Sequence, residues 1–351
     1  MTELLEARHV SKIFGGGLIR KHRTLALEDF SLSLGGGQPS ITGVVGESGS
    51  GKTTMARLLL GLESPTLGEV LYRGKDLRRL SRTEWRAFLR DVQIIFQDPF
   101  EVYNSFYTVD HVLATPIAKF RLASSQRESQ ALIEEVLQAV GLRPEETLGR
   151  YPHQLSGGQR QRIMVARALL LSPKLIIADE PVSMIDASLR ATVLDNLRQL
   201  NQGFGISLIY ITHDLTTAYQ ISHNIIVLYR GSVAEAGDVE LVVGHPQHPY
   251  TRLLIGSIPL PDPNRRWSGE ASASALGKQA GDDVGCKFAD RCPHAFSLCL
   301  EKAPPLFQTH PNRAAACYLY RDHPAIQTEE MDKVFLQRTA PSNMQAGQPL
   351  G

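Results

Sequence analysis

The segment Gly46-Glu47-Ser48-Gly49-Ser50-Gly51-Lys52-Thr53 decides the fold, because it fits the pattern G-x-x-x-x-G-K-[ST] at every fixed position. The apolar run Ile41–Val45 before it predicts a buried strand, and the run Thr53–Leu62 after it predicts a helix. Glycines allow torsions that turn successive N–H groups toward one point, and a helix N-terminus adds partial positive charge. The segment therefore predicts a loop that cradles the phosphates of a nucleotide.

Two pairs of residues, one in this segment and one later in the chain, suggest metal binding and hydrolysis of the nucleotide. Lys52 would reach the β- and γ-phosphates, and the Thr53 hydroxyl would ligate Mg²⁺. Asp179 and Glu180 follow the apolar run Leu175–Ala178, which predicts another strand. One carboxylate at such a strand end can hold Mg²⁺, and the next can polarise an attacking water.

A second Gly-rich segment, Leu155–Gln159, precedes a helix predicted over Gln161–Leu171. A serine and two glycines at a helix N-terminus form a further phosphate cradle. Because one nucleotide has only one γ-phosphate, a second cradle in the same chain indicates a second nucleotide.

The order of predicted elements indicates an α/β fold. Runs at Lys174–Ala178 and Ser207–Thr212 predict strands, with a helix over Ser188–Leu200 between them. Helical periodicity dominates about 98–171, which predicts a helical insert. Small and polar residues over Ser268–Asp283 are typical of a linker. We expect a nucleotide-binding α/β domain at 1–244, a four-cysteine extension at 245–327 and a disordered polar tail at 328–351.

Composition excludes several classes. The 351 residues are 42% hydrophobic and 21% charged, as in an ordinary soluble protein. The 37 basic and 36 acidic residues give a net charge of +1, which lacks the overall basic field that supplies nucleic-acid affinity, so we expect no nucleic-acid partner. With no run of eighteen apolar residues and an acidic start at Glu3 and Glu6, we expect no membrane span and no secretory signal.

The sequence LSGGQRQR at 155–162, together with the phosphate loop and the acidic strand end, resembles the nucleotide-binding subunits of ATP-binding cassette (ABC) transporters. The resemblance covers about residues 7–243 and implies a P-loop, RecA-like α/β domain with a helical subdomain at about 98–171. It also implies head-to-tail pairing, in which the Ser156 loop of one domain covers ATP held by the Lys52 loop of the other.

The same resemblance assigns further residues. Gln97 matches the Q-loop residue that contacts Mg²⁺ and the lytic water, and His213 matches the switch histidine near the γ-phosphate. Asp186 matches the D-loop aspartate, although Met184-Ile185 replaces the usual Ala-Leu, and Phe14 lies where an aromatic ring, commonly Tyr, stacks on adenine. The implied catalytic residues are Glu180, His213 and Gln97, and the implied Mg²⁺ ligands are Thr53, Gln97 and Asp179. The implied nucleotide-binding residues are Phe14, Gly46, Glu47, Ser48, Gly49, Ser50, Gly51, Lys52, Thr53, Thr54, Asp179, Ser156, Gly157, Gly158, Gln159 and Asp186.

The later part of the chain narrows the resemblance. The segments His248–Thr251, Ser257–Pro259, Arg291–Pro293 and Pro304–Leu306 are similar to the C-terminal extension of oligopeptide and dipeptide importer ATPases, the peptide/nickel uptake class. This similarity implies a peripheral ATPase at the cytoplasmic face of the membrane. Its expected partners are a second, homologous but non-identical ATPase, two membrane-spanning permease subunits and an extracytoplasmic solute-binding protein. A homodimer is the alternative pairing, and oligosaccharides or metal chelates are the alternative cargoes.

The four cysteines, Cys286, Cys292, Cys299 and Cys317, are spaced C-x₅-C-x₆-C-x₁₇-C. Zinc sites usually use C-x₂₋₄-C pairs, and neither close pair here is that short. Four thiolates on longer loops suit a [4Fe–4S] cluster, which some of the importer ATPases that this tail resembles carry. Zinc, and thiols that only pack or oxidise in a small module, remain the alternatives.

Three other classes of ABC protein fit less well. DNA-repair and chromosome ATPases carry long coiled coils or zinc inserts between the two cradles, whereas only about 100 residues separate Lys52 from Ser156, without heptads. Translation-associated ABC proteins carry two cassettes in one chain, and this chain has one. An exporter ATPase would keep the chemistry but would not predict the tail that begins at His248.

Overall fold

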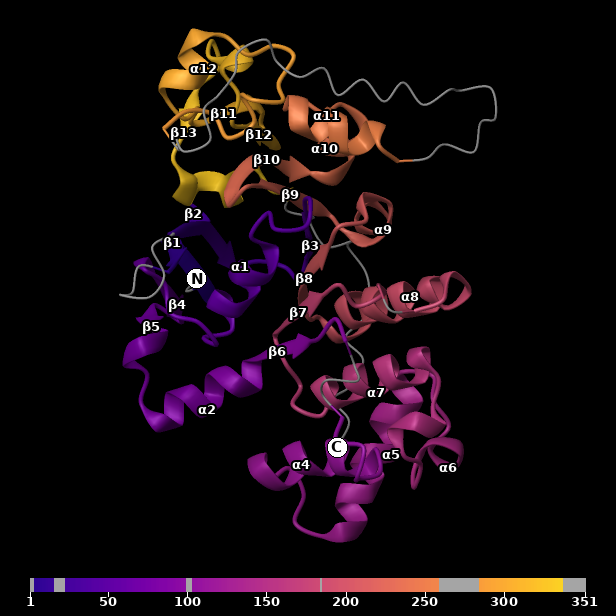
Figure 1. Ribbon diagram of the computed structural model, residues 1–351. Coiled ribbons are helices and arrows are strands. Elements are labelled where there is room, and N and C mark those ends of the chain that lie inside the picture. The colour runs from indigo at the N-terminus through magenta and orange to yellow at the C-terminus, as the bar shows by residue number, and fades with distance from the viewer. Residues whose placement is uncertain (1–2, 16–22, 99–102, 184, 259–283, 337–351) are drawn as a thin grey trace, which may run out of the picture.

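The computed structural model describes residues 3–15, 23–98, 103–183, 185–258 and 284–336. Within these residues the strands form a sheet of nine strands and a sheet of four (Figure 1). Helices alternate with the strands of the larger sheet, so the α/β class predicted from the sequence is confirmed. The predicted linker at Ser268–Asp283 lies outside the described residues.

The larger sheet has the strand order β13-β11-β12-β10-β9-β3-β8-β7-β6. Strands β9 to β6 of this order are parallel, and their continuous apolar sequences are typical of strands covered on both faces. Ile41 and Val45 pack on the face covered by α7, α8 and α9, and Val44 packs on the face covered by α1. The parallel strands are β3 (Ile41–Val45), β6 (Val92–Ile95), β7 (Leu175–Asp179), β8 (Ser207–Thr212) and β9 (Asn224–Tyr229).

The other half of this sheet is antiparallel and includes the C-terminal extension. Strand β12 pairs with β10 in the register Glu235↔Ala315, and β11 and β13 continue from it. Gly237, at φ 148°, is required at this junction because a Cβ there would lie 2.3 Å from the Asn312 carbonyl oxygen. The strands are β10 (Ser232–Asp238), β11 (Leu306–His310), β12 (Arg313–Ala315) and β13 (Ala325–Ile326).

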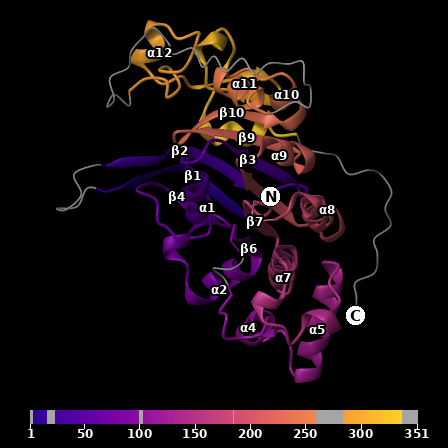
Figure 2. The ribbon, with the colours of Figure 1, turned by 45° about the vertical axis from the view of Figure 1, so that its right-hand side comes forward.

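The smaller, antiparallel sheet has the order β2-β1-β4-β5 and shares one hydrophobic core with α1 and the larger sheet (Figure 2). Helix α1 contacts β1, β2 and β7 and so lies between the two sheets. The elements of this region are β1 (Leu5–Phe14), β2 (Thr24–Leu34), α1 (Lys52–Leu59), β4 (Leu67–Tyr72), β5 (Lys75–Asp76), η1 (Leu77–Arg79) and α2 (Arg82–Asp91).

Helices occupy the segment where the sequence predicts a helical insert, and they form the end of the molecule farthest from the C-terminal extension (Figure 1). Helix α5 packs against α7, which returns the chain to β7. The helices of this region are α4 (Asp110–Phe120), α5 (Gln126–Ala139), α6 (Pro144–Thr147), η2 (Pro152–Gln154) and α7 (Gly157–Leu169). The remaining helices are α8 (Ala187–Phe204), α9 (Leu215–Ile221), α10 (Val239–Gly244), α11 (Pro249–Gly256), α12 (Ser297–Glu301), η3 (Tyr318–Tyr320) and η4 (Thr328–Val334).

Two expectations need correction. The helix predicted over Gln161–Leu171 begins at Gly157, because Ser156 caps it and Gln159 completes a capping box. The tail predicted to be disordered from residue 328 begins with η4, which packs on β2 with Met331 and Val334 buried. Residues 337–351 of that tail lie outside the described residues. No helix in the described part of the chain combines the length and apolarity needed to cross a bilayer.

Candidate nucleotide site

Three parallel strands bring the predicted site residues to one edge of the sheet. Val45 at the end of β3 pairs with Thr212 at the end of β8, and Asp179 at the end of β7 pairs with Ile211. The residues that follow, Gly46, Glu180 and His213, therefore lie together at the carboxyl edge. Ligands of open α/β sheets bind at this edge.

The loop from Gly46 to Gly51 joins β3 to α1, and its glycines are required where the backbone is crowded. A Cβ at Gly46 would lie 2.2 Å from the Leu228 carbonyl oxygen, and one at Gly51 would lie 2.5 Å from the Ala26 carbonyl oxygen. Gly51 is the N-cap residue of α1 and, having no side chain, it provides no side-chain cap for the first turn. The N–H groups of that turn are thus available to an anion.

Lys52 lies beneath this loop with only 5% of its surface exposed. Its Nζ donates to the carbonyl oxygens of Gly46, at 2.7 Å, and Glu47, at 2.9 Å. Burial lowers the pKa of Lys52, against the opposing effect of the Glu180, Asp179 and Glu47 carboxylates. The Lys52 ammonium group is therefore held by two neutral carbonyl oxygens. An anionic phosphate oxygen is a stronger hydrogen-bond acceptor and can take their place.

Asp179 and Thr53 provide the oxygen donors that Mg²⁺ prefers. Burial, and then the neighbouring Glu180 carboxylate, raise the pKa of Asp179, while a hydrogen bond with the Thr53 side chain opposes the rise. Asp179 Oδ1 is buried and has no hydrogen-bond partner among the described residues. A buried carboxylate oxygen without a partner is costly unless a cation meets it, so these two residues fit a magnesium ion.

Glu180 is the meeting point of the three residues predicted to be catalytic. Gln97 Nε2 donates to Glu180 Oε2 at 3.1 Å, and His213 Nδ1 lies 3.0 Å from Glu180 Oε1. Glu180 has φ 45°, a left-handed conformation that a non-glycine residue adopts at some energetic cost and that is common at functional sites. The structure thus brings Gln97, Glu180 and His213 together beside the phosphate loop.

The second cradle does not join this group. Ser156 is exposed at the N-terminus of α7, where its Oγ accepts from the Gln159 N–H at 3.2 Å and Gln159 Oε1 accepts from the Ser156 N–H at 2.9 Å. Helix α7 lies apart from α1 in both views (Figures 1 and 2). Asp186 is also exposed, at the N-cap of α8. Within one chain these residues face solvent instead of the Lys52 loop.

Phe14 is at the end of β1, paired with Thr24 of β2. Thr24 is two residues from Ala26, whose carbonyl oxygen leaves no room for a side chain at Gly51. The Phe14 ring is 39% exposed, with Lys12 Nζ 5.0 Å from its centroid. Phe14 thus lies on the strand beside β2, the strand that contacts the loop at Ala26, and it is exposed enough for its ring to stack on a base. The adjoining residues 16–22 lie outside the described part of the chain.

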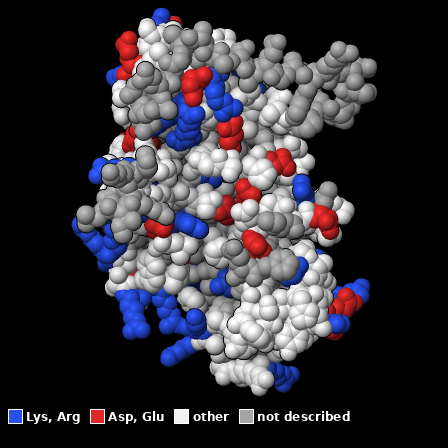
Figure 3. Space-filling view, viewed as in Figure 1, with Lys and Arg blue, Asp and Glu red and all other residues white. Residues whose placement is uncertain are grey.

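Positive charge on the visible surface gathers over α2, away from this edge (Figure 3). Arg82, Arg86 and Arg90 of that helix are all exposed. The net charge of +1 therefore conceals a local basic surface beside the smaller sheet.

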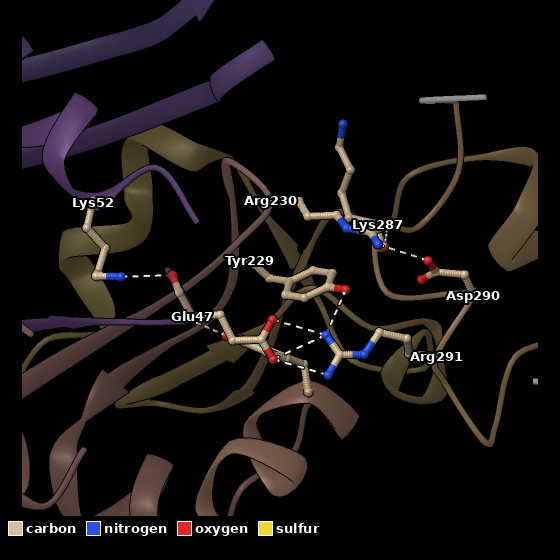
Figure 4. Close-up of polar contacts among 8 residues, drawn as sticks. Glu47, Lys52, Tyr229, Arg230, Lys287, Asp290 and Arg291 are labelled. Carbon is tan, nitrogen blue, oxygen red and sulfur yellow. Dashed lines mark hydrogen bonds and ion pairs between the residues drawn. The ribbon is translucent and has the colours of Figure 1, made fainter. Parts of the chain in front are cut away.

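Two contacts to the phosphate loop were missed by the sequence analysis. The Glu47 N–H donates to Tyr250 Oη at 2.9 Å. Arg291 forms an ion pair with the Glu47 carboxylate at 3.0 Å, which Figure 4 shows. Both side chains belong to motifs that the sequence analysis recognised, but a separation of 244 residues between Arg291 and Glu47 leaves no local signal of contact. The C-terminal extension thus touches the nucleotide site.

The four cysteines line one pocket in the extension, together with His248, Phe288 and Tyr318. Burial raises the pKa of Cys292 and raises that of Cys317 to about 12, and the other three thiols add to the effect on Cys317. Within the described residues, no three His, Cys, Asp or Glu side chains come close enough to hold one metal ion. The thiols share a pocket but do not form the tight tetrahedron that zinc needs.

Comparison with protein-family models assigns two parts of the chain. Residues 27–183 match the model described as ABC transporter, and residues 234–299 match the model described as oligopeptide/dipeptide transporter, C-terminal region. The first match contains the phosphate loop, Gln97, the Ser156 segment and the acidic strand end. The second contains Tyr250 and Arg291.

Whole-chain comparisons agree with these matches. The chain is 38% identical over 322 residues to the oligopeptide transport ATP-binding protein OppF of Haemophilus influenzae, covering 90% of this chain and 96% of OppF. It is 42% identical over 266 residues to OppF of Escherichia coli, covering 75% and 79%. Among solved structures, the dimeric ATP-binding cassette MJ0796 bound to ADP and Pi matches with a TM-score of 0.59 and 30% identity over 67% of this chain and 98% of that one. CbiO1 of Clostridium perfringens, at 24% identity over 70% and 92% of the two chains and a TM-score of 0.60, shares the fold.

Proposed function

The chain belongs to the ABC transporter family, in its branch of oligopeptide transport ATP-binding proteins, and we propose that it is the ATP-hydrolysing subunit of a peptide importer. One observation carries the proposal: Gln97, Glu180 and His213 meet beside the phosphate loop, in a chain that also has the oligopeptide-type C-terminal region. Oligosaccharides and metal chelates are the alternative cargoes. The alternative direction of transport is export.

In the proposed site the phosphate loop and the first turn of α1 bind the phosphates of ATP. Lys52 transfers its hydrogen bonds from the loop carbonyls to the β- and γ-phosphates, and the exposed Phe14 ring stacks on adenine. Thr53, Asp179 and Gln97 would hold Mg²⁺, which would neutralise charge on the phosphates. The remaining loop residues assigned to the nucleotide are Gly46, Glu47, Ser48, Gly49, Ser50, Gly51 and Thr54.

We propose that Glu180 polarises the attacking water. The water oxygen bonds to the γ-phosphorus in line as the bond to the β–γ bridging oxygen breaks, and Glu180 takes the water proton. The geometry supports this role, because Gln97 and His213 each contact a different oxygen of the Glu180 carboxylate and so fix its orientation. His213 then also stands beside the γ-phosphate.

A second ATPase subunit completes the proposed site. At the start of α7, Ser156 is exposed, Gly157 and Gln159 are partly exposed, and Gly158 is buried. Asp186, six residues after Glu180, is exposed. We propose that these residues cover ATP bound to a homologous, non-identical partner, while the partner's equivalents cover ATP bound here. Closure on ATP and reopening after hydrolysis would then move two permease subunits at the cytoplasmic face of the membrane, with cargo delivered by an extracytoplasmic solute-binding protein.

We divide the proposed subunit into an ATPase unit at 1–244, with its helical subdomain at about 98–171, and an extension at 245–327. The pairing of β12 with β10 supports an extension that is built onto the sheet of the ATPase unit. Residues 328–334 are part of this packed structure through η4.

We further propose that Cys286, Cys292, Cys299 and Cys317 hold a [4Fe–4S] cluster. Four thiols around one pocket are the donor set of such a cluster. Each cysteine binds a different iron atom of the cluster, so the four sulfur atoms need not converge on a single metal ion. The cluster would supply cross-links between loops instead of redox chemistry, because ATP-driven uptake needs no electron.

Purification of the assembled transporter through a tag on this chain tests partners and cargo together. Intact mass spectrometry should find two different ATPase masses and two permease subunits. In proteoliposomes, solute-binding protein loaded with an oligopeptide should stimulate ATP hydrolysis, whereas oligosaccharide or metal-chelate loads should not. A single ATPase mass would overturn the heterodimer, and stimulation by another cargo in place of peptide would overturn the peptide assignment.

A further inference from the structure

Glu47, the second residue of the phosphate loop, is held at three points, of which Figure 4 shows the contact with Arg291. Its carbonyl oxygen accepts from Lys52 Nζ at 2.9 Å, its N–H donates to Tyr250 Oη at 2.9 Å, and its carboxylate accepts from Arg291. Arg291 makes a forked contact, with Nη1 3.1 Å from Oε1 and 3.0 Å from Oε2, and Nη2 3.1 Å from Oε1. Two of the three contacts therefore come from the C-terminal extension.

Tyr250 has a fixed position from which to make its contact. It is fully buried in α11, with its ring centroid 4.4 Å from that of Tyr229 and 5.6 Å from that of Phe288. His248 caps this helix by accepting from the Tyr250 N–H at 3.0 Å, and the buried Glu235 of β10 accepts from the His248 N–H at 2.9 Å. The segment His248–Thr251, which we call the HPYT segment, thus holds the Tyr250 hydroxyl in a fixed position beside the phosphate loop.

Arg291 is supported in the same way. Its guanidinium carbon lies 5.9 Å from the ring centroid of Tyr229 and 5.6 Å from that of Phe288, and its Nη1 donates to Tyr229 Oη at 3.4 Å. The hydrogen bonds with Glu47 raise the pKa of Arg291. A planar fork against two aromatic rings keeps the guanidinium in the orientation that matches the carboxylate.

Charge gives this contact a consequence for the nucleotide. The Glu47 carboxylate belongs to the loop that receives the triphosphate, and it is close enough to influence the pKa of Lys52. An uncompensated negative charge at this position would oppose a polyanion. Arg291 neutralises it without donating to the phosphate region itself.

We propose that Arg291 and Tyr250 are positioning residues of the nucleotide site, through which the C-terminal extension fixes the Glu47 peptide and neutralises its carboxylate for polyphosphate binding. This inference rests on the proposed function, because it requires that the loop bind ATP. It gives the HPYT segment and the Arg291 segment a common role.

The test is ATP affinity, measured with a fluorescent ATP analogue on the full-length chain, together with KM and kcat in the assembled transporter. Arg291→Gln should weaken analogue affinity about 5-fold, the upper range for a half-exposed ion pair, and raise KM for ATP while kcat changes less than about 2-fold. Arg291→Lys, which keeps the charge but loses the fork, should fall between wild type and Arg291→Gln. Tyr250→Phe, which keeps the ring packing but removes the acceptor, should cause a smaller loss.

The double variant Glu47→Gln/Arg291→Gln separates positioning from general stability. Because it removes both charges, it should recover most of the affinity that Arg291→Gln loses. Arg230→Gln is the matched control: it removes the same charge and a neighbouring ion pair to Asp290 at 3.0 Å, without touching the loop. It should bind the analogue like wild type.

Each result decides the inference. Arg291→Gln affinity equal to that of Arg230→Gln, or a double variant at least as weak as Arg291→Gln, would overturn it while the ATP site stands. A wild-type chain that does not bind the analogue would overturn the proposed function and this inference with it.

Discussion

The nucleotide edge and the cysteine pocket both gather reactive side chains, but they do so in opposite ways. At the edge, Gly46, Glu180 and His213 are placed by the ends of three parallel strands, and charged groups remain open to a ligand. In the pocket, four cysteines on loops and short helices lie among aromatic rings, and burial raises the pKa of Cys292 and Cys317, so these thiols are neutral unless a metal binds them.

The difference shows what each region is built to do. A buried cation such as Lys52 and a carboxylate oxygen without a partner on Asp179 cost folding free energy, and binding of an anion with its metal relieves both. Buried thiols cost little when they are neutral, and a cluster bound to them would cross-link the loops that carry them. The edge is therefore expected to govern activity and the pocket to govern stability, and the following predictions test that division.

The largest effect is expected at Lys52. Lys52→Ala should weaken ATP binding about 100-fold, the loss expected for about 3 kcal/mol of charge-assisted hydrogen bonding. Because burial lowers the pKa of Lys52, removing the ammonium group should not lower the melting temperature. Titration with a fluorescent ATP analogue and thermal unfolding measure the two quantities. Lys75→Ala, which removes only an exposed ion pair with Glu84, is the control, and unchanged affinity in Lys52→Ala would refute the assignment.

An intermediate effect is expected in the pocket. After anaerobic purification, the chain should contain about four iron and four sulfide ions and absorb visible light. Cys292→Ser should lower the iron content and the melting temperature by several degrees, because a ligand that binds only the folded state is lost. ATP affinity should change far less than in Lys52→Ala. A colourless, iron-free wild type that still supports transport would rule out the cluster, and the pocket would then hold packed thiols.

The third effect is expected on stability alone, and only over a limited pH range, at Glu235, which anchors the segment His248–Thr251. Burial raises its pKa from 4.5 to about 7, so its contribution to stability is fully present below pH 4.5 and is lost as pH rises to about 7. Relative to wild type, Glu235→Gln should gain unfolding free energy over that interval, by at most about 3 kcal/mol.

Urea unfolding at several pH values measures this difference. The buried His248, whose pKa burial lowers to about 4, loses its contribution in the opposite direction, as pH falls from 6.5 to about 4. It is present in both proteins, so its effect cancels in the comparison. Parallel pH profiles for wild type and Glu235→Gln would show that Glu235 does not titrate in this range.

Parts of the fold that depend on continuous patterns were predictable. The runs Ile41–Val45 and Ser207–Thr212 match β3 and β8 at both ends, because a buried parallel strand is uniformly apolar and its ends are polar or glycine. The start of α7 was placed four residues late, because the glycines at 157 and 158 conceal a helix that Ser156 begins. In η4 the polar composition hid Met331 and Val334, which pack on β2.

The residues of the candidate site also fall into a group that the sequence analysis assigned and a group that it missed. Glu180 could be assigned from its position after a predicted strand, and His213 only from the resemblance to ABC ATPases. The structure adds that the shared carboxyl edge of the parallel strands brings them together. The contact of Arg291 with Glu47 could not be predicted, because it depends on how β12 docks on β10 and how α11 lies beside the loop. Long-range side-chain contacts of this kind follow from packing and leave no periodic trace in the sequence.

The central claim is that this edge binds ATP and hydrolyses it through Glu180, and Glu180→Gln in the assembled transporter tests it most directly. The amide keeps the size of the carboxylate and can still contact Gln97 and His213, but it cannot take the water proton. Retained nucleotide and turnover are measured together, by chromatographic analysis of the bound nucleotide and by phosphate release. The account predicts that the variant retains ATP, stays closed with its partner and releases almost no phosphate. Phosphate release near the wild-type rate would contradict it.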